Sequence, residues 1–190
     1  TVVLAIGVGN ALCRDVVHVD LVGSANSPAV VVSQNHTAVV LFRGGASTQR
    51  AVENQLARRG VTTVELLADL RLDPENACTL PARTMCQVAV QPVGSAVTRQ
   101  TQTAAVETLR TRFGCLVRLT IGEQQFVTVS GTVTLAEPVR VQWLLASPAK
   151  PEAVQWEQLL SRSDHYQWMQ GGEAVYASLS LRPSGGWRAE

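Results

Sequence analysis

The sequence predicts a single α/β domain in which two β-sheets are sandwiched by helices. Short apolar runs typical of strands lie towards both ends of the chain, and segments with helical spacing lie between them. The chain has 190 residues, of which 46% are hydrophobic, and this is enough to bury the core of one domain. No low-complexity segment or interdomain linker interrupts this order.

The first 13 residues differ from the rest because they are uncharged and mostly apolar. They are shorter than the roughly 20 residues that a membrane-spanning helix needs. We therefore expect 1–13 to be either the end of a preceding membrane segment or a buried first segment, and the domain proper to occupy 14–190. Because the first residue is Thr1 and not Met, we also expect a fragment or a processed product.

The first half predicts three adjacent strands between Val16 and Phe42, where apolar runs are separated by turn residues. Ser47 is positioned to cap a helix that runs to about Arg59, and Gly60 follows as a C-terminal stop. A buried strand is then expected over Val61–Leu67.

The second half predicts another helix, strand and hairpin. Ala105, Leu109 and Phe113 fall on one helical stripe, which Gly114 ends. The elements expected in this half are recognised by helical spacing, strand-like alternation or turn residues. They are a helix over Arg99–Phe113, a strand over Cys115–Ile121, a hairpin turning at Ser130-Gly131, an alternating strand over Val139–Leu145, a short helix over Pro151–Leu160, and a last strand over Ala174–Leu181 followed by a turn at Pro183–Gly186.

Charge and cysteine spacing exclude some function classes. The formal net charge is only +1, so the charge balance gives no strong electrostatic argument for binding nucleic acid, which favours a basic face or stripe. The Arg58-Arg59 pair and the Arg110-x-Arg112 pair are expected at helix ends, where they complement the helix dipole. The cysteines lack zinc-ribbon spacing, so we expect small buried side chains or, outside the cytosol, a disulfide. These cysteines are Cys13, Cys78, Cys86 and Cys115.

The order of elements over 16–80 carries a resemblance to a known family. Strands that end in Gly44-Gly45, then a helix ending Leu56-Ala57-Arg58-Arg59-Gly60-Val61, then Val64-Glu65-Leu66-Leu67, are similar to the metallo-β-lactamase-like C-terminal domain of ComEC-type DNA-uptake (competence) proteins. The resemblance implies an αββα sandwich of two mixed β-sheets flanked by helices, either complete or truncated. It also implies a bacterial membrane protein whose channel portion is the partner of this domain, with the domain itself soluble and outside the cytoplasm.

The metal motif of that family is missing from this chain. Active members carry His-x-His-x-Asp-His, which holds one or two metal ions, zinc or manganese, that activate a water molecule. Position by position, the His ligands fall on Arg71, Asp73 and Asn76, and the Asp falls on Glu75. A carboxylate at the end of the third strand is replaced by Phe42. The resemblance therefore implies a degenerate copy without a catalytic residue, a bound metal or a cofactor.

The acids of this segment leave two readings open. Asp69, Asp73 and Glu75 are close in sequence and could bind a hard cation such as Mg²⁺ or Mn²⁺, which would make the domain an active metal-dependent nuclease or phosphodiesterase. Alternatively, Arg71 pairs with one of these acids and replaces the metal charge. We favour the interpretation in which Arg71 pairs with an acid and no metal binds. A further alternative is that the chain is a stand-alone α/β interaction domain.

DNA remains a candidate partner, on the basis of late aromatic residues. The side chains that could stack on bases are Trp156, His165, Tyr166, Trp168 and Trp187. Few basic residues accompany them, so packing within the protein is the simpler expectation. The chain lacks a phosphate-binding loop of the Walker type, so we expect no nucleotide cofactor.

Overall fold

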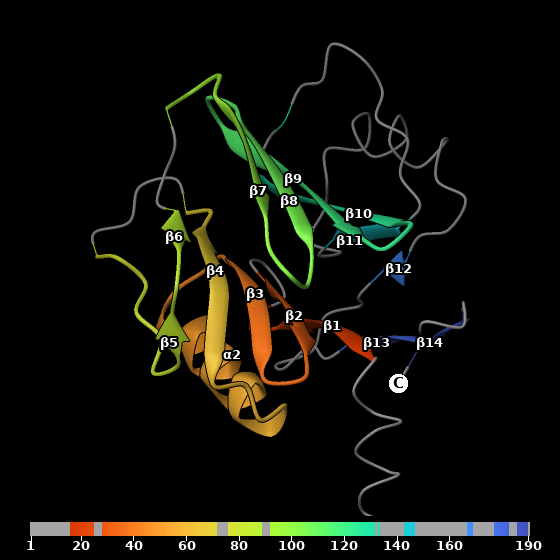
Figure 1. The fold of residues 1–190 in the computed structure, drawn as a ribbon. Coiled ribbons are helices and arrows are strands. Elements are labelled where there is room, and N and C mark those ends of the chain that lie inside the picture. Colours follow the sequence, from red (N-terminus) through yellow and green to blue (C-terminus); the bar gives the residue numbers. More distant parts are fainter. Residues whose placement is uncertain are drawn as a thin grey trace, which may run out of the picture.

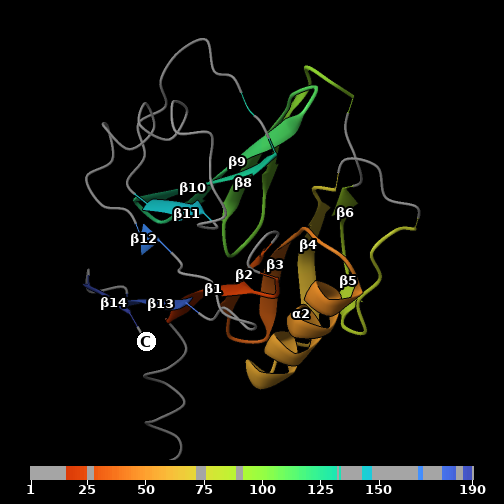
Figure 2. The same cartoon turned by 180° about the vertical axis from the view of Figure 1, so that it is seen from behind.

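The protein is described here by a computed structural model, in which two β-sheets face each other and one helix covers the outer face of the first sheet (Figure 1). The structure describes residues 16–24, 28–71, 76–88, 92–131, 133, 143–146, 167–168, 177–182 and 186–189. Seen from behind, helix α2 (Ala46–Arg58) again lies on the side of the first sheet away from the second (Figure 2).

The first sheet contains the strands from the two ends of the chain. Its order is β14-β13-β1-β2-β3-β4-β5, and β6 also pairs with β4. Neighbours from β14 to β3 are antiparallel, whereas β4 runs parallel to β3, β5 and β6. The bounds are β1 (Val17–Val22), β2 (Ala29–Gln34), β3 (Thr37–Phe42), β4 (Thr63–Asp69), β5 (Arg83–Thr84), β6 (Gln87–Val88), β13 (Ala177–Arg182) and β14 (Gly186–Ala189).

The second sheet is formed by the middle of the chain, in the order β12-β11-β10-β9-β8-β7. The pairs from β7 to β10 are antiparallel, and β11 and β12 add in parallel. The bounds are β7 (Ala96–Gln100), β8 (Ala105–Arg110), β9 (Gly114–Ile121), β10 (Gln124–Gly131), β11 (Trp143–Ala146) and β12 (Gln167–Trp168).

The central strands β1 to β4 of the first sheet are buried on both faces. Along β2, Val30 and Val32 pack towards the second sheet, while Val31 packs towards α2, and all three are fully buried. The same alternation continues in β3 and β4, because successive side chains of a strand point to opposite faces. Burial on both faces explains why the sequences of these strands are continuous apolar runs.

Helix α2 confirms the predicted helix, but its N-terminal cap is different. The N-cap is Gly45, without a side-chain hydrogen bond, so the expected cap at Ser47 is wrong and Ser47 lies inside the first turn. At the other end, Gly60 has φ +65° and the Val61 N–H donates to the Leu56 carbonyl over 2.9 Å, which is a Schellman ending. No helix in the described part of the chain is long and apolar enough to cross a bilayer.

The expected helix over Arg99–Phe113 is wrong, because this segment forms strands β7 and β8. Burial in β8 alternates strictly, with Val106, Thr108 and Arg110 buried and their neighbours half-exposed. The Thr101 side chain and backbone close the turn by hydrogen bonds with Ala104. The dipole role expected for Arg110 and Arg112 therefore does not exist.

The expected turn at Ser130-Gly131 is also wrong. Both residues belong to β10 and pair with Cys115 and Gly114 of β9, and the true turn is Gly122-Glu123, where Gly122 has φ +58°. Strand β9 confirms the expectation for Cys115–Ile121, and β13 confirms the part of Ala174–Leu181 that starts at Ala177, since 174–176 lie outside the described residues. Several expectations lie outside the described residues, namely those for 1–13, 139–142, the helix over 151–160 and the turn at 183–185.

The predicted fold class is confirmed, since two mixed sheets pack face to face with a helix on the outer face. A buried ion pair fastens that helix to the first sheet. Asp20 of β1 is 1% exposed and accepts hydrogen bonds from Arg59 over 2.8 and 3.0 Å and from Gln55 over 2.7 Å. The C-terminal end of α2 is thereby held against β1.

We expect Asp20→Asn to lower the free energy of unfolding by about 2 kcal/mol, because Arg59 and Gln55 lose their charged acceptor. Urea unfolding followed by circular dichroism measures this. The matched control is Glu107→Gln, which alters the half-exposed Arg118–Glu107 pair and should cost less than about 1 kcal/mol. Equal losses in the two variants would contradict the role given to Asp20.

Candidate functional site

The candidate site lies where the parallel strands β3 and β4 end. Phe42 and Asp69 are opposite each other as the last residues of these strands, and the Leu70 N–H donates to the Phe42 carbonyl over 2.9 Å. Phe42 belongs to the cluster on the helix side of the sheet. Because parallel strands end at one edge, the chain segments that follow them meet there.

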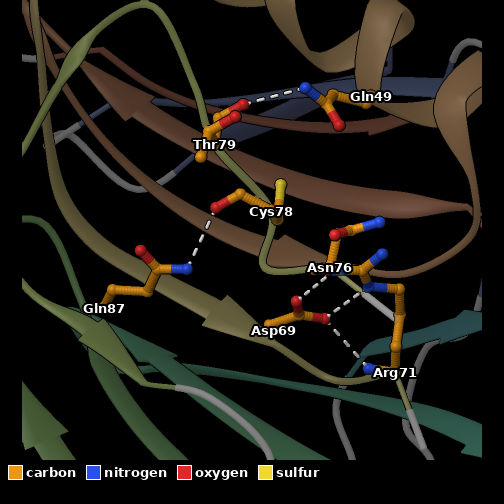
Figure 3. Close-up of polar contacts among 7 residues, drawn as sticks. All are labelled: Gln49, Asp69, Arg71, Asn76, Cys78, Thr79 and Gln87. Atoms are coloured by element: carbon orange, nitrogen blue, oxygen red, sulfur yellow. Dashed lines mark hydrogen bonds and ion pairs between the residues drawn. The ribbon is translucent and has the colours of Figure 1, made fainter. Parts of the chain in front are cut away.

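Arg71 holds the Asp69 carboxylate with two side-chain hydrogen bonds (Figure 3). Its Nε donates to Oδ1 over 2.9 Å and its Nη2 donates to Oδ2 over 2.6 Å. The Arg71 backbone N–H adds a third bond to Oδ1 over 3.2 Å. The Asp69 side chain is only 2% exposed. Both carboxylate oxygens are therefore engaged by one neighbouring cation in the fork geometry that guanidinium groups prefer.

Two further contacts fix the Arg71 guanidinium. Nη2 also donates to the Asn76 carbonyl over 2.6 Å, and the guanidinium carbon lies 5.1 Å from the centre of the Phe42 ring. The hydrogen bond to Asp69 raises the pKa of Arg71, so the group stays charged at every physiological pH. The guanidinium thus links the end of β3, the end of β4 and the segment at Asn76.

Glutamine side chains hold the segment that follows Asn76. Gln87 donates to the Cys78 carbonyl over 3.0 Å, and Gln49 of α2 donates to the Thr79 carbonyl over 2.8 Å (Figure 3). Cys78 itself is 1% exposed, and burial, followed by the negative charge of Asp69, raises the pKa of its thiol to about 11. The thiol is therefore neutral at physiological pH and is a poor metal ligand.

The described residues of this site do not fit a transition metal. Zinc in a hydrolase needs three protein ligands, usually with imidazoles among them, and one open position. Here the available carboxylate is bound by Arg71, and a guanidinium cannot act as a ligand. Within the ranges that the structure describes, no three His, Cys, Asp or Glu side chains lie close enough together to hold one ion.

The structure brings together three of the five residues that the sequence singled out. Phe42 and Arg71 are in contact, and Asn76 meets Arg71 through its carbonyl. Asp73 and Glu75 lie outside the described residues. The expected pairing of Arg71 with one of the nearby acids is confirmed, and the acid is Asp69. The sequence could have singled out Asp69 among the nearby acids, because Asp69 ends a buried strand and therefore needs a counter-charge.

The expectation that the cysteines are buried is correct for Cys78 and Cys115 and wrong for Cys86, which is exposed. Cys86 lies just before the edge strand β6, and its backbone carbonyl accepts a hydrogen bond from the Leu67 N–H of β4. This strand pairing involves only the backbone, so it does not require the Cys86 side chain to be buried. All three are free thiols, and Cys13 lies outside the described residues.

Among proteins of known structure, the chain is similar to a metallo-β-lactamase. This is the crystal structure of MEM-A1, a subclass B3 metallo-β-lactamase isolated from a soil metagenome library, with a TM-score of 0.39 and 13% identity over 83% of this chain and 77% of that chain. No protein-family model and no curated protein matches the chain. A similarity of this size assigns neither a family nor an activity.

We expect Arg71→Met to lower the free energy of unfolding by about 2 kcal/mol, because the buried Asp69 carboxylate loses its counter-charge. Urea unfolding at neutral pH measures the change. Arg118→Met is the matched control, since it removes an arginine from a half-exposed pair and should cost less than about 1 kcal/mol. A loss no larger than in the control would show that Arg71 is not needed at this site.

We expect the neutral Cys78 thiol to make stability depend on alkaline pH. Its pKa is raised from 9.0 to about 11 on folding, so the contribution is complete below pH 9 and is lost as the pH rises towards 11. The free energy of unfolding should fall by roughly 1–2 kcal/mol over this range. Cys78→Ala should lack this part of the decline, and Cys86→Ala should keep it. Identical pH profiles for the wild type and Cys78→Ala would contradict this assignment.

Proposed function

We propose that this chain is a catalytically degenerate metallo-β-lactamase-like domain of a ComEC-type DNA-internalisation membrane protein, and that it serves as a structural, docking or DNA-handling module. The observation that carries the proposal is the closed Asp69–Arg71 pair at the end of β4. This is the position at which the resembled family carries its metal motif.

The argument is one of charge replacement. A buried carboxylate needs a compensating cation, which a metal ion provides in an active hydrolase. Here the compensating charge is the Arg71 guanidinium, which also bonds to Asn76 and lies against Phe42. A guanidinium offers no open coordination position and does not lower the pKa of a water molecule, so the residues around it would keep the fold without the hydrolytic step.

The role of the parent protein follows from the resemblance over 16–80. In that setting, the partner of the domain is the membrane channel portion of the same protein, and the domain lies outside the cytoplasm. DNA would be handled without being cut. The two mixed sheets and the helix α2 on the first of them are compatible with this setting.

The experiment is metal analysis of the purified domain after incubation with Zn²⁺ and Mn²⁺, combined with a DNA nuclease assay. We expect less than about 0.1 metal ion per chain and no cleavage, because the carboxylate is saturated by Arg71. Arg71→His restores an imidazole at one motif position, and Arg118→His is the control for added histidine away from the site.

Stoichiometric metal with cleavage in the wild type would contradict the proposal. It would favour the alternative reading, an active metal-dependent nuclease whose ligands include acids between Asp69 and Glu75. If Asp69→Asn then removed both metal and cleavage while the domain stayed folded, that alternative would replace the proposal.

A further inference from the structure

A second buried cation lies on the other face of the same sheet edge. Arg43 follows β3 directly and is 4% exposed. Its Nε donates to the Pro28 carbonyl over 2.8 Å, and its Nη1 donates to the Val129 carbonyl of β10 over 2.6 Å. Arg43 therefore joins the first sheet to the second, whereas Arg71 lies on the helix side.

The guanidinium of Arg43 differs from that of Arg71 because no carboxylate in the described part of the chain pairs with it. Its hydrogen bonds within the described residues go to two carbonyl groups, and Nη2 is buried without an acceptor. Burial lowers the pKa of Arg43 to about 10, so the group remains charged at neutral pH. A buried cation with an unused donor is costly unless an anion compensates for it.

A second guanidinium acts on the same region. Arg110 ends β8, is 8% exposed and is paired in register with Cys115 of β9, which is 4% exposed. Burial raises the pKa of the Cys115 thiol, while the positive charges of Arg110 and Arg43 act in the opposite direction. Both cations therefore act on one buried thiol, which is neutral at physiological pH.

We propose that Arg43 binds a small oxyanion between the two sheets, near the end of β8 and the start of β9. Guanidinium groups recognise phosphate and carboxylate oxygens through charge-assisted hydrogen bonds, and the Nη2 group of Arg43 is the donor that remains to be used. The burial of Arg43 selects an anion small enough to be enclosed, such as inorganic phosphate, over the backbone of a nucleic acid. Binding should be slow, because an anion reaches Nη2 only when the sheets separate locally.

The test measures stability against phosphate at constant ionic strength, with sodium chloride as the replaced salt. A ligand that binds only the folded state changes the folded-to-unfolded ratio in proportion to its concentration once the site is filled. We expect about a tenfold gain in that ratio for each tenfold rise in phosphate above the dissociation constant. Acetate in place of phosphate distinguishes a carboxylate from a phosphate ligand.

Arg43→Met should lose the phosphate-dependent gain, whatever its effect on stability in chloride. Arg99→Met is the matched control, because Arg99 is exposed on β7 and its side-chain hydrogen bond goes to the neighbouring Thr98 carbonyl, so this variant should keep the full gain. A gain in Arg43→Met equal to that of the wild type would overturn the proposal. So would equal stability of the wild type in phosphate, acetate and chloride.

If Arg43→Met does not fold, equilibrium dialysis of the wild type with labelled inorganic phosphate and with labelled acetate decides the matter. One bound anion per chain, retained by Arg99→Met and reduced at least tenfold by Arg110→Met, is the expected result. Absence of binding of both anions overturns the proposal. This outcome is independent of the metal analysis described above, because Arg43 and Asp69 lie on opposite sides of the sheet.

Discussion

Strands β1 to β4 of the first sheet are buried on both faces, and this constraint decides how the buried carboxylates of β1 and β4 are paired. Their inner face packs on the second sheet and their outer face on α2, so Asp20 and Asp69 are almost completely shielded from water. Asp20 is met by Arg59 and Gln55, and Asp69 is met by Arg71. Burying a carboxylate costs free energy, and a partner of opposite charge offsets that cost. The identity of this partner determines what chemistry the site can perform.

At the end of β4 that partner is a guanidinium. A metal ion and a guanidinium can both neutralise a buried carboxylate, but they differ in what remains open. A metal keeps a position for water and makes that water acidic, whereas Arg71 uses its donors on Asp69 and the Asn76 carbonyl. The ring of Phe42 then packs against the guanidinium plane. A metal ion at this edge of the sheet would give a reactive site with an open coordination position. The described residues instead form a closed site, in which Arg71 occupies both oxygens of the carboxylate.

The elements that sequence reasoning predicted correctly are those whose signals are local and agree with their burial. The apolar runs of β1 to β4 reflect burial on both faces, and Gly60 marks the end of α2 through its positive φ. The segment 99–113 misled because Ala105, Leu109 and Phe113 fit a helical stripe while lying on the less buried face of a strand or in a turn. The pairing of Asp69 with Arg71 could be predicted because the two residues are neighbours. The environment of Arg43 could not, because its acceptors come from Pro28 and from Val129 in the other sheet.

The most direct test of the closed site is a double-mutant cycle on Asp69 and Arg71, using Asp69→Asn, Arg71→Met and the double variant in urea unfolding. The cycle isolates the interaction between the two side chains from the other effects of each substitution. Charge replacement at a buried carboxylate predicts a coupling free energy of about 2 kcal/mol or more, with the double variant more stable than the sum of the single losses implies. A coupling below about 0.5 kcal/mol would mean that Arg71 does not compensate for the charge of Asp69, and the central claim would be wrong.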